Sequence, residues 1–516
     1  MKKFLSLVLA LVMTMSLVTI SAGAKDFDDN GDIDYKEAVD VISALGIVDG
    51  YSDGSFRPDG SLTRGAAAKI ICNLILGPTT ASALSATTAP FKDVPTTNTF
   101  AGYITYCAQQ GIIGGYGDGT FRPSGTLTGN AFMKMLLGAL GYDSSIEGYT
   151  GSNWQVNVTK QAIGIGLDDG NDDFVGSKAV TRQEAALYAC NMLQATMVEY
   201  DQKSTIVVGD VQVNTSSTRS DVANATRTDG NIDNDNKMQF AEKYFTDLNR
   251  VDGSDDFGRP SNVWEYKNDE IGTYANTDDL VETYTAKVTS ADVYDAVGKS
   301  VYDSLDDGKS DLVSYIDGVK TEVKASDVEN YVEKNNTTKV NGSGNGMLTE
   351  VYLDDDNNVT IVSINTYVFQ AVSDYSSSKD SVSLTTAGDT NITLSDNTLD
   401  GDDFDIEDIK ADDYILVTAV KDGSRYDVKT IAVAEVVTGT VNSYKSEDSV
   451  TIGDTTYKYS LTALDESDDS GVKNTMYTVG QEAAVVLDSY GYIIAVDAAV
   501  VSNNYVYISE FAQPSG

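Results

Sequence analysis

Two arginines stand at the first position of predicted helices, where a positive charge is unfavourable. Arg64 follows Thr63 and Arg182 follows Thr181, and both threonines occupy the place of a helix N-cap. A cation at this end opposes the helix macrodipole by about 0.3–1 kcal/mol, so we expect each arginine to have a task outside its own helix. A guanidinium beside the free N–H groups of a helix start can bind a carboxylate or a phosphate.

An ion pair within the fold is the alternative task for these arginines. Asp29 and Asp93 are the candidate partners, and both interpretations can hold together. The threonine at position 128 is followed by Gly129, so this helix start lacks an arginine and we expect it to add little to anion binding. Thr181 and Glu184 have the spacing of a capping box, which supports the helix itself.

An acidic stretch near the N-terminus, Asp26–Glu37, matches the pattern of an EF-hand calcium loop. Its candidate ligands are Asp26, Asp28, Asn30, Asp32 and Glu37, with Gly31 at the sharp turn. The entering helix of an EF-hand is missing, and Phe27–Asp29 resembles Phe91–Asp93, so we favour the start of a repeated unit over a calcium loop. A second Asp-rich run, Asp229–Asp235, lacks the glycine of a calcium loop, and we expect a solvated loop there.

The composition excludes several classes of function. The formal net charge of −42 argues against direct binding to nucleic acid or to an anionic membrane surface. The chain contains no histidine, which removes Ser-His-Asp and Cys-His nucleophile systems and His-ligated zinc. Three cysteines, Cys72, Cys107 and Cys190, lie in apolar helical contexts, and we expect small buried side chains rather than disulfides.

The elements that position the arginines form a repeat. Gly46–Thr63 and Gly111–Thr128 agree at 12 of 18 positions with a constant offset of 65 residues. A third, more diverged copy runs from Gly164 through Phe174 to Thr181. Each copy indicates a helix that ends at a glycine, a loop with turn residues, and a second helix that starts after the threonine.

These residues resemble the S-layer homology (SLH) repeat of bacterial surface proteins, over residues 25–198. The matching residues include Gly46-Ile47, Phe56, Thr63-Arg64, their counterparts from Gly111 to Thr128, and Thr181-Arg182-Gln183-Glu184. The resemblance implies that the repeats hold the protein on the cell wall by binding pyruvylated secondary wall polysaccharide. The pyruvate ketal is a carboxylate, the kind of anion that Arg64 and Arg182 can receive, and we expect Asp29, Asp93, Gly46, Gly111, Thr63 and Thr181 to belong to the same site.

We expect a multidomain chain with a helical first part and a strand-rich second part. The predicted divisions are a signal peptide at 1–24, SLH repeats at 25–89, 90–141 and 142–198, a partly ordered acidic linker at 199–273, and a β-rich region at 274–516. No single repeat can bury its own apolar stripe, so three should pack as one all-α pseudo-threefold unit. Short β-branched segments beyond residue 274 predict all-β sandwich- or barrel-like units. The segment that starts at Gln370 weakly resembles the one that starts at Gly439, which indicates a repeat of such units.

Together these patterns predict a secreted, non-catalytic surface protein that is held on the wall by its SLH repeats. The alternatives are an SLH-anchored enzyme that acts on polysaccharide and an SLH-anchored adhesin. Trp264 is the only tryptophan beyond the repeats, and this scarcity disfavours sugar-stacking chemistry in the β-rich region. Calcium is the one candidate cofactor, because loops such as Asp354–Asn358 and Asp402–Asp405 offer oxygen ligands for it. We expect calcium bound there to govern self-association into a layer.

Overall fold

The computed structural model describes residue 25 and residues 27–201, 205–208, 211–214, 217–224, 231–233, 235–463 and 471–497. Contacts divide the chain into two units. The helical unit comprises Ser21–Asp252 and Asn262–Thr273, and the strand-rich unit comprises Gly253–Ser261 and the chain from Tyr274 onward. The predicted signal peptide lies outside the described residues.

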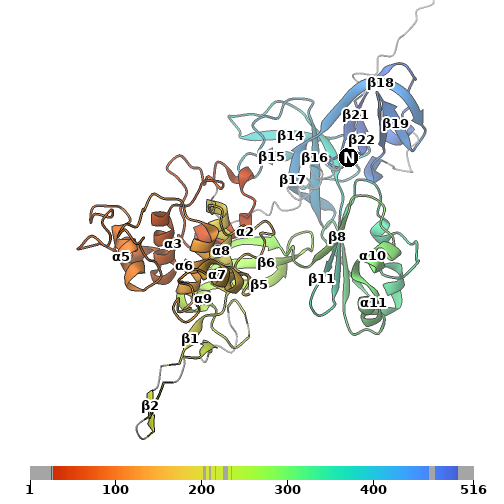
Figure 1. Cartoon of the computed structure of the whole chain (residues 1–516). Helices are drawn as coiled ribbons and strands as arrows, with labels where there is room; N and C mark the ends of the chain where they lie inside the picture. Colours follow the sequence, from red (N-terminus) through yellow and green to blue (C-terminus); the bar gives the residue numbers. More distant parts are fainter. Residues whose placement is uncertain are drawn as a thin grey trace, which may run out of the picture. The chain divides into compact units, whose positions relative to one another are not determined.

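The helical unit contains the three predicted copies of the helix–loop–helix pattern (Figure 1). Its helices are η1 (Asn30–Asp32), α2 (Lys36–Ala44), α3 (Arg64–Leu76), α4 (Pro78–Ser82), α5 (Ala101–Gln109), α6 (Gly129–Ala139), α7 (Trp154–Ile163), α8 (Arg182–Gln194) and α9 (Phe240–Tyr244). The threonines before α3, α6 and α8 each accept a hydrogen bond from the third amide of the helix, and Thr181 with Glu184 forms the capping box. The predicted N-caps are therefore confirmed.

A ring of backbone hydrogen bonds connects the segments that precede these three helices. The amide of Leu62 donates to Val180 O at 2.9 Å, Val180 N donates to Leu127 O at 2.9 Å, and Leu127 N donates to Leu62 O at 3.0 Å. All three residues are buried. The ring fixes the starts of α3, α6 and α8 relative to one another, so residues at one helix start can reach the loop of another copy.

The region that the sequence predicts as a linker contains regular structure. It holds β1 (Val198–Tyr200), β2 (Thr205–Val208), β3 (Val211–Asn214), β4 (Arg219–Asp221), β5 (Leu248–Ser254), β6 (Pro260–Tyr266) and β7 (Asp269–Ala275), with pairs β1-β4 and β2-β3 and a sheet β5-β6-β7. Trp264 of β6 is fully buried, and its indole Nε1 donates to Glu37 of α2 at 2.7 Å. The buried indole packs this region against the helices. The weak hydrophobic periodicity of the sequence does not predict this packing.

The strand-rich unit begins with a mixed sheet in the order β10-β9-β12-β11-β8. The strands are β8 (Leu280–Tyr284), β9 (Leu312–Ile316), β10 (Val319–Val323), β11 (Leu348–Leu353) and β12 (Val359–Ile364), with short helices η2 (Ala325–Asn330) and η3 (Val340–Gly342). Two further helices, α10 (Ser290–Val297) and α11 (Lys299–Asp306), lie against one face of the sheet (Figure 1). The expectation of all-β units is wrong for this part, because Val293, Val297, Val301 and Leu305 recur every four residues and bury a helical stripe.

Two five-stranded antiparallel modules follow. The first has β13 (Tyr367–Ala371), β14 (Ser381–Thr386), β15 (Thr398–Asp400), β16 (Tyr414–Asp422) and β17 (Arg425–Val433), and the second has β18 (Glu435–Lys445), β19 (Ser449–Ile452), β20 (Thr455–Lys458), β21 (Glu482–Leu487) and β22 (Ile493–Val496), with η4 (Leu461–Ala463) and η5 (Val472–Asn474). Their sheet orders, β15-β14-β13-β16-β17 and β20-β19-β18-β21-β22, are the same. The weak sequence repeat at Gln370 and Gly439 therefore marks the first strand of each module.

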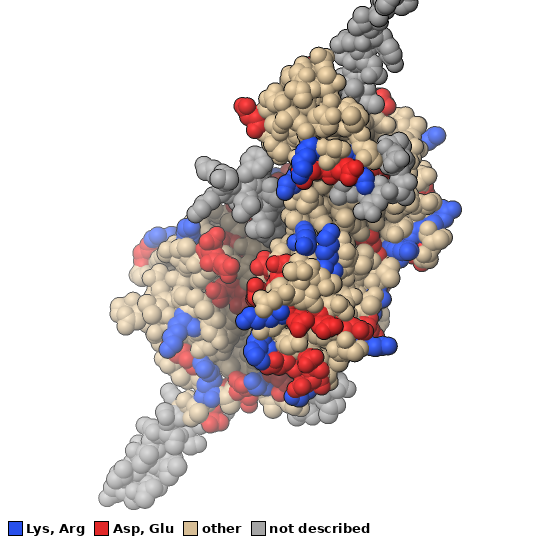
Figure 2. Space-filling model, turned by 90° about the vertical axis from the view of Figure 1, so that its right-hand side faces the viewer, with Lys and Arg blue, Asp and Glu red and all other residues tan. Residues whose placement is uncertain are grey.

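The described surface carries charges of both signs. Figure 2 shows acidic side chains interspersed with lysines and arginines over the face that it presents. Among the described residues, no helix combines the length and the apolar character that crossing a membrane requires.

Candidate functional site

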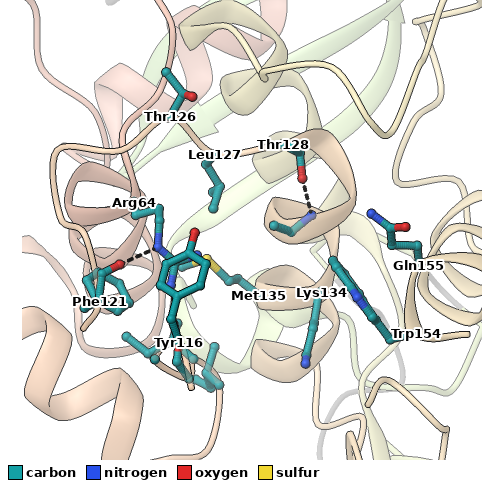
Figure 3. A pocket seen from close by; sticks show the side chains of 15 residues that line it. Arg64, Tyr116, Phe121, Thr126, Leu127, Thr128, Lys134, Met135, Trp154 and Gln155 are labelled. Atoms are coloured by element: carbon teal, nitrogen blue, oxygen red, sulfur yellow. Dashed lines mark hydrogen bonds between the residues drawn. The ribbon is translucent and has the colours of Figure 1, made fainter. Parts of the chain in front are cut away.

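A cavity of about 510 Å³ lies where the start of α3 meets the loop of the second copy and the start of α7. We call it the Arg64 cavity. Figure 3 shows Arg64 and Tyr116 on one side, Lys134 and Trp154 on the other, and Met135 between them. The lining thus includes two cations and three aromatic rings, those of Tyr116, Phe121 and Trp154, and its parts come from all three copies.

Arg64 is held in place by two backbone carbonyls of the second copy. Its Nε donates to Phe121 O at 2.8 Å, and its Nη2 donates to Gly114 O at 3.1 Å. The guanidinium carbon lies 4.3 Å from the centre of the Phe121 ring and 5.1 Å from that of Tyr116. Burial lowers the pKa of Arg64, but a guanidinium remains charged at any physiological pH. No carboxylate pairs with it in the described part of the chain.

Arg182 makes the equivalent contacts to the loop of the first copy. Its Nε donates to Phe56 O at 2.8 Å and its Nη2 donates to Asp49 O at 2.9 Å. The guanidinium carbon lies 4.7 Å from the Phe56 ring centre and 4.8 Å from that of Tyr51. The two arginines therefore share one structural task, which is to fix the loop of a neighbouring copy from within.

The predicted ion pair between these arginines and Asp29 or Asp93 does not form. Asp29 instead accepts hydrogen bonds from the amides of Phe56 and Arg57, both at 2.6 Å, and Asp93 accepts from Phe121 and Arg122 at 2.7 Å. Burial opposes ionisation of each carboxyl, yet the two backbone amides hold the pKa of both aspartates below the usual range. The aspartates shape the same loop backbone whose carbonyls the arginines bind.

The helix-start amides are not free, contrary to the prediction. Arg64 N donates to Gly125 O at 2.9 Å, and Arg182 N donates to Gly60 O at 2.9 Å. The next amide of each helix also donates to a loop carbonyl, and Thr63 or Thr181 accepts from the third. These amides bind the adjacent copy, so an external anion would contact the arginine and lysine side chains.

The arginine of one copy enters the loop of another copy. The site that lacks an arginine therefore lies at a different loop from the one that the sequence predicts. Sequence spacing assigned it to the second copy, because Gly129 follows Thr128. In the structure Gly129 faces the loop of the third copy, where a Cβ on this glycine would lie 2.9 Å from the Phe174 ring. A cavity of about 250 Å³ there is lined by four carboxylate side chains and one lysine, namely Asp34, Asp59, Asp173, Glu184 and Lys178.

Three residues of the Arg64 cavity were missed from the sequence: Tyr116, Lys134 and Trp154. Lys134 Nζ donates to Tyr149 O at 2.7 Å and lies 5.6 Å from the Trp154 ring centre, and burial lowers its pKa. The offset of 65 residues pairs Lys134 with Lys69, so the repeat itself carried a usable signal. Trp154 comes from a stretch with no aligned aromatic residue.

The predicted glycines serve the helix ends. Gly46 and Gly111 have positive φ angles of 69° and 72°, which confirms their role in terminating α2 and α5. Neither lines the Arg64 cavity, whereas Gly114 and Gly115 do. At Gly115 a Cβ would lie 2.4 Å from the Phe91 ring, so that position requires glycine.

The candidate calcium loop of the first copy is used for other contacts. Asp26 lies outside the described residues, and Asn30 and Asp32 belong to η1. Glu37 Oε1 accepts from Trp264 Nε1 at 2.7 Å and from Asn262 Nδ2 at 3.1 Å. Asp28 N donates to Gly54 O, as Lys92 N donates to Gly119 O in the second copy. This equivalence supports the interpretation as the start of a repeat.

The three cysteines are free and buried, as the sequence predicts. The sulfur atoms of Cys72 in α3 and Cys107 in α5 are 3.5 Å apart. Their mutual contact and their burial raise the pKa of the Cys107 thiol. Such thiols pack as apolar groups between the first and second copies.

Comparison with known families identifies part of the helical unit. The family model of the S-layer homology domain matches residues 26–68 and 90–132. The diverged third copy is not covered by this match, so its assignment stays a prediction.

Similar proteins come from bacterial surfaces. The chain is 25% identical to the cell surface protein of Thermoanaerobacter kivui over 96% of this chain and 62% of that protein. It is 27% identical to the surface layer protein of Brevibacillus choshinensis over 33% of this chain and 15% of that protein. It is 39% identical to a cellulosome-anchoring protein of Acetivibrio thermocellus over 15% of this chain and 17% of that protein. The chain thus spans less than two thirds of the length of each of these relatives.

Two copies of the helical unit, at residues 26–68 and 90–132, are therefore S-layer homology domains, in a chain that is similar to proteins named for the bacterial cell surface.

Proposed function

We propose that this protein is a non-catalytic structural component of the cell surface, and that its three SLH copies bind a cell-wall polysaccharide in the Arg64 cavity. One observation carries the proposal. The chain has 78 acidic residues, yet none of the described aspartates and glutamates lines this cavity, while Arg64 and Lys134 both do. A site kept free of carboxylates in so acidic a protein suits an anionic ligand.

The ligand chemistry follows from the lining. A carboxylate, such as the pyruvate ketal of a wall polysaccharide, would approach Arg64 and Lys134, whose charges are partly desolvated and therefore weakly screened. Tyr116 and Trp154 offer ring faces for the apolar side of a sugar. The proposed ligand is thus a sugar that carries a carboxylate.

The three sites should differ in affinity. At the Arg182 site, the carboxylate of Asp49 lies 3.9 Å from Lys69 Nζ and offsets the positive charge of this lysine. The residue that corresponds to Asp49 at the Arg64 cavity is Gly114, which carries no charge. The third cavity has Gly129 in place of an arginine and carries four carboxylates. We therefore rank the Arg64 cavity first, the Arg182 site second and the third cavity last. The hydrogen-bond ring of Leu62, Leu127 and Val180 supports a pseudo-threefold arrangement of the three copies.

Sedimentation of the full chain with purified wall sacculi tests this function. Trp154→Ala removes an aromatic wall of the cavity and should reduce the bound fraction several-fold. Val156→Ala is the matched control, because Val156 lies on the same helix, is 68% exposed and does not line the cavity. Chemical removal of the ketal from the wall should lower binding of the unchanged protein to the level of Trp154→Ala. Equal binding by all three samples would contradict the proposal.

The strand-rich unit is proposed to form the outer surface, with calcium-dependent self-association through its acidic loops. The relatives named above are described as surface, cell-surface or anchoring proteins rather than enzymes, which supports a structural role over a wall-anchored enzyme. Light scattering of the full chain in millimolar calcium and then in chelator tests the association. A constant monomer mass would leave the acidic loops as a solvated surface only, and binding of an external ligand without assembly would favour an adhesin.

A further inference from the structure

Two side-chain oxygen atoms near the end of the helical unit are buried and have no hydrogen-bond partner within the described part of the chain. They are Oε1 of Gln239 and Oε1 of Glu242, on residues that are 1% and 4% exposed. A buried acceptor without a partner costs about 1–3 kcal/mol, and more when it is charged. A bound ion or water is one of the explanations for such groups in a folded protein.

These two residues close a stretch with the spacing of a calcium loop. Its potential ligands are Asn231, Asp233, Asp235, the carbonyl of Lys237, Gln239 and Glu242, at positions 1, 3, 5, 7, 9 and 12 of the loop pattern. Each of them offers an oxygen atom as a metal ligand, and three of these ligands are carboxylates. A set of hard oxygen ligands with this charge favours calcium over softer transition metals.

The sequence predicts a solvated loop for Asp229–Asp235, because this run lacks the glycine of a calcium loop. In the register that ends at Glu242, the glycine position of the pattern is Asn236, with φ of 61°. Asparagine is one of the few residues other than glycine that adopts the left-handed conformation at low cost. The backbone therefore makes the turn that glycine makes in other calcium loops, and the objection from sequence is removed.

Both ends of the stretch are anchored in the fold. Met238 N donates to Val222 O at 2.8 Å, and Met197 N donates to Met238 O at 2.8 Å, immediately after α8. Phe240 is fully buried and its amide donates to Ala195 O at 3.0 Å. At the other end, Arg250 N donates to Asn231 O at 2.9 Å. A cation in this loop would therefore stabilise the segment of the chain that follows the SLH copies.

Part of the ligand set is already assembled. Asp235 Oδ1 accepts from Lys237 N at 2.8 Å and from Gln239 Nε2 at 3.0 Å, and Glu242 Oε2 accepts from Asn224 Nδ2 at 2.9 Å. Asp233 is exposed. Among the described residues, the three carboxylates that come within 4.8 Å of one another are Asp380, Asp400 and Asp402, so the loop carboxylates do not yet converge. Lys237 Nζ lies 3.7 Å from Asp235 Oδ2, so a divalent cation would replace this ion pair when it binds.

We propose that the six ligand positions between Asn231 and Glu242 bind one calcium ion, and that the ion draws Asp233 and Asp235 toward Gln239 and Glu242. The affinity should fall in the range of extracellular calcium modules, with a dissociation constant on the order of 10⁻⁴–10⁻³ M. The ion would stiffen the exit from α8 without contacting the Arg64 cavity.

Calorimetric titration of the full chain with calcium, in a constant excess of magnesium that occupies weak acidic sites, tests the proposal. Glu242→Gln should abolish one binding event, and Asp233→Asn should weaken it at least about tenfold by removing one ligand charge. Asp233→Asn is the decisive variant, because the exposed side chain of Asp233 makes no hydrogen bond to the residues that the structure describes. Asp252→Asn is the matched control, since Asp252 is an exposed acidic residue of the same unit with a 93% exposed side chain.

Thermal unfolding provides a second measurement. Calcium should raise the midpoint of the unmodified chain and of Asp252→Asn, and this rise should shrink in Asp233→Asn and vanish in Glu242→Gln. If Glu242→Gln fails to fold, Asp233→Asn alone decides the outcome. An unchanged titration and an unchanged midpoint shift in Asp233→Asn would overturn the proposal, and so would loss of the site in the Asp380→Asn variant of the other acidic cluster.

Discussion

The guanidinium of Arg182 and the carbonyl oxygen of Phe56 are joined by a hydrogen bond of 2.8 Å, although 126 residues separate them in the chain. The amide of the same Phe56 donates to Asp29 at 2.6 Å. One peptide segment of the first loop is therefore held on both sides, by the arginine of another copy and by the aspartate of its own. Arg64, Phe121 and Asp93 repeat this arrangement.

We predict energetic coupling between Arg182 and Asp29. Arg182→Ala should lower the free energy of unfolding by about 1–3 kcal/mol, because it leaves loop carbonyls without a donor. In a double-mutant cycle, Arg182→Ala and Asp29→Ala should couple by about 0.5–3 kcal/mol, since both act on the Phe56 segment. Urea unfolding followed by circular dichroism measures this. Arg182→Ala with Asp93→Ala is the control, and additive behaviour in both cycles would contradict the shared role.

Removal of the Tyr149 hydroxyl should not destabilise the protein. Its oxygen is buried and has no hydrogen-bond partner among the residues that the structure describes, so Tyr149→Phe should leave the free energy of unfolding unchanged or raise it by up to about 1–3 kcal/mol. Tyr188→Phe is the matched control, because the Tyr188 oxygen accepts from Asn171 Nδ2 at 2.7 Å. That variant should lose about 1–3 kcal/mol. Similar losses in both variants would show that the Tyr149 hydroxyl has a partner in solution.

Asp488 should make stability depend on pH in the strand-rich unit. Burial raises its pKa to about 7, although its carboxylate accepts from the amides of Tyr490 and Tyr492 at 2.9 Å. Between about pH 4 and pH 7 the folded state keeps a proton that the unfolded state has lost, so the free energy of unfolding falls as pH rises through this window. The expected loss is on the order of 4 kcal/mol.

The comparison with Asp488→Asn isolates this contribution. Asparagine does not titrate, so the variant should gain stability relative to the unchanged protein as pH rises from about 4 to 7. Denaturant unfolding at several pH values measures the difference, and Asp454→Asn serves as an exposed control. A difference that is constant with pH would show that Asp488 ionises normally in the folded protein.

Arg259 should be among the most sensitive positions of the strand-rich unit. Its Nε donates to Glu350 at 2.6 Å and its Nη1 to Asp255 at 3.1 Å, and all three side chains are at most 5% exposed. Arg259→Met leaves two buried carboxylates unpaired, so it should cost about 3–5 kcal/mol. The double variant Arg259→Met/Glu350→Leu should recover part of this loss, since it removes one of the unpaired charges. Denaturant unfolding measures both, and a loss below about 1 kcal/mol would mean that water reaches the pair.

The sequence by itself determined the local features of the helical unit. Thr63, Thr128 and Thr181 cap their helices, and Gly46 and Gly111 end theirs, because each task involves backbone groups within a few residues. The offset between copies also located the loops correctly. These features depend on short-range sterics and hydrogen bonds, which residue type and spacing encode directly.

Only the tertiary structure decided the partners of the long-range contacts. The arginines cross into the loops of other copies, the aspartates cap amides instead of pairing with cations, and the helix-start amides bind carbonyls rather than an external anion. The missing glycine of the run Asp229–Asp235 predicts a solvated loop, whereas the φ angle of Asn236 permits the turn of a calcium loop between Asn231 and Glu242. In each case the outcome depends on which backbone segments packing brings together and on the conformation they hold there. Residue identity along one segment does not contain that information.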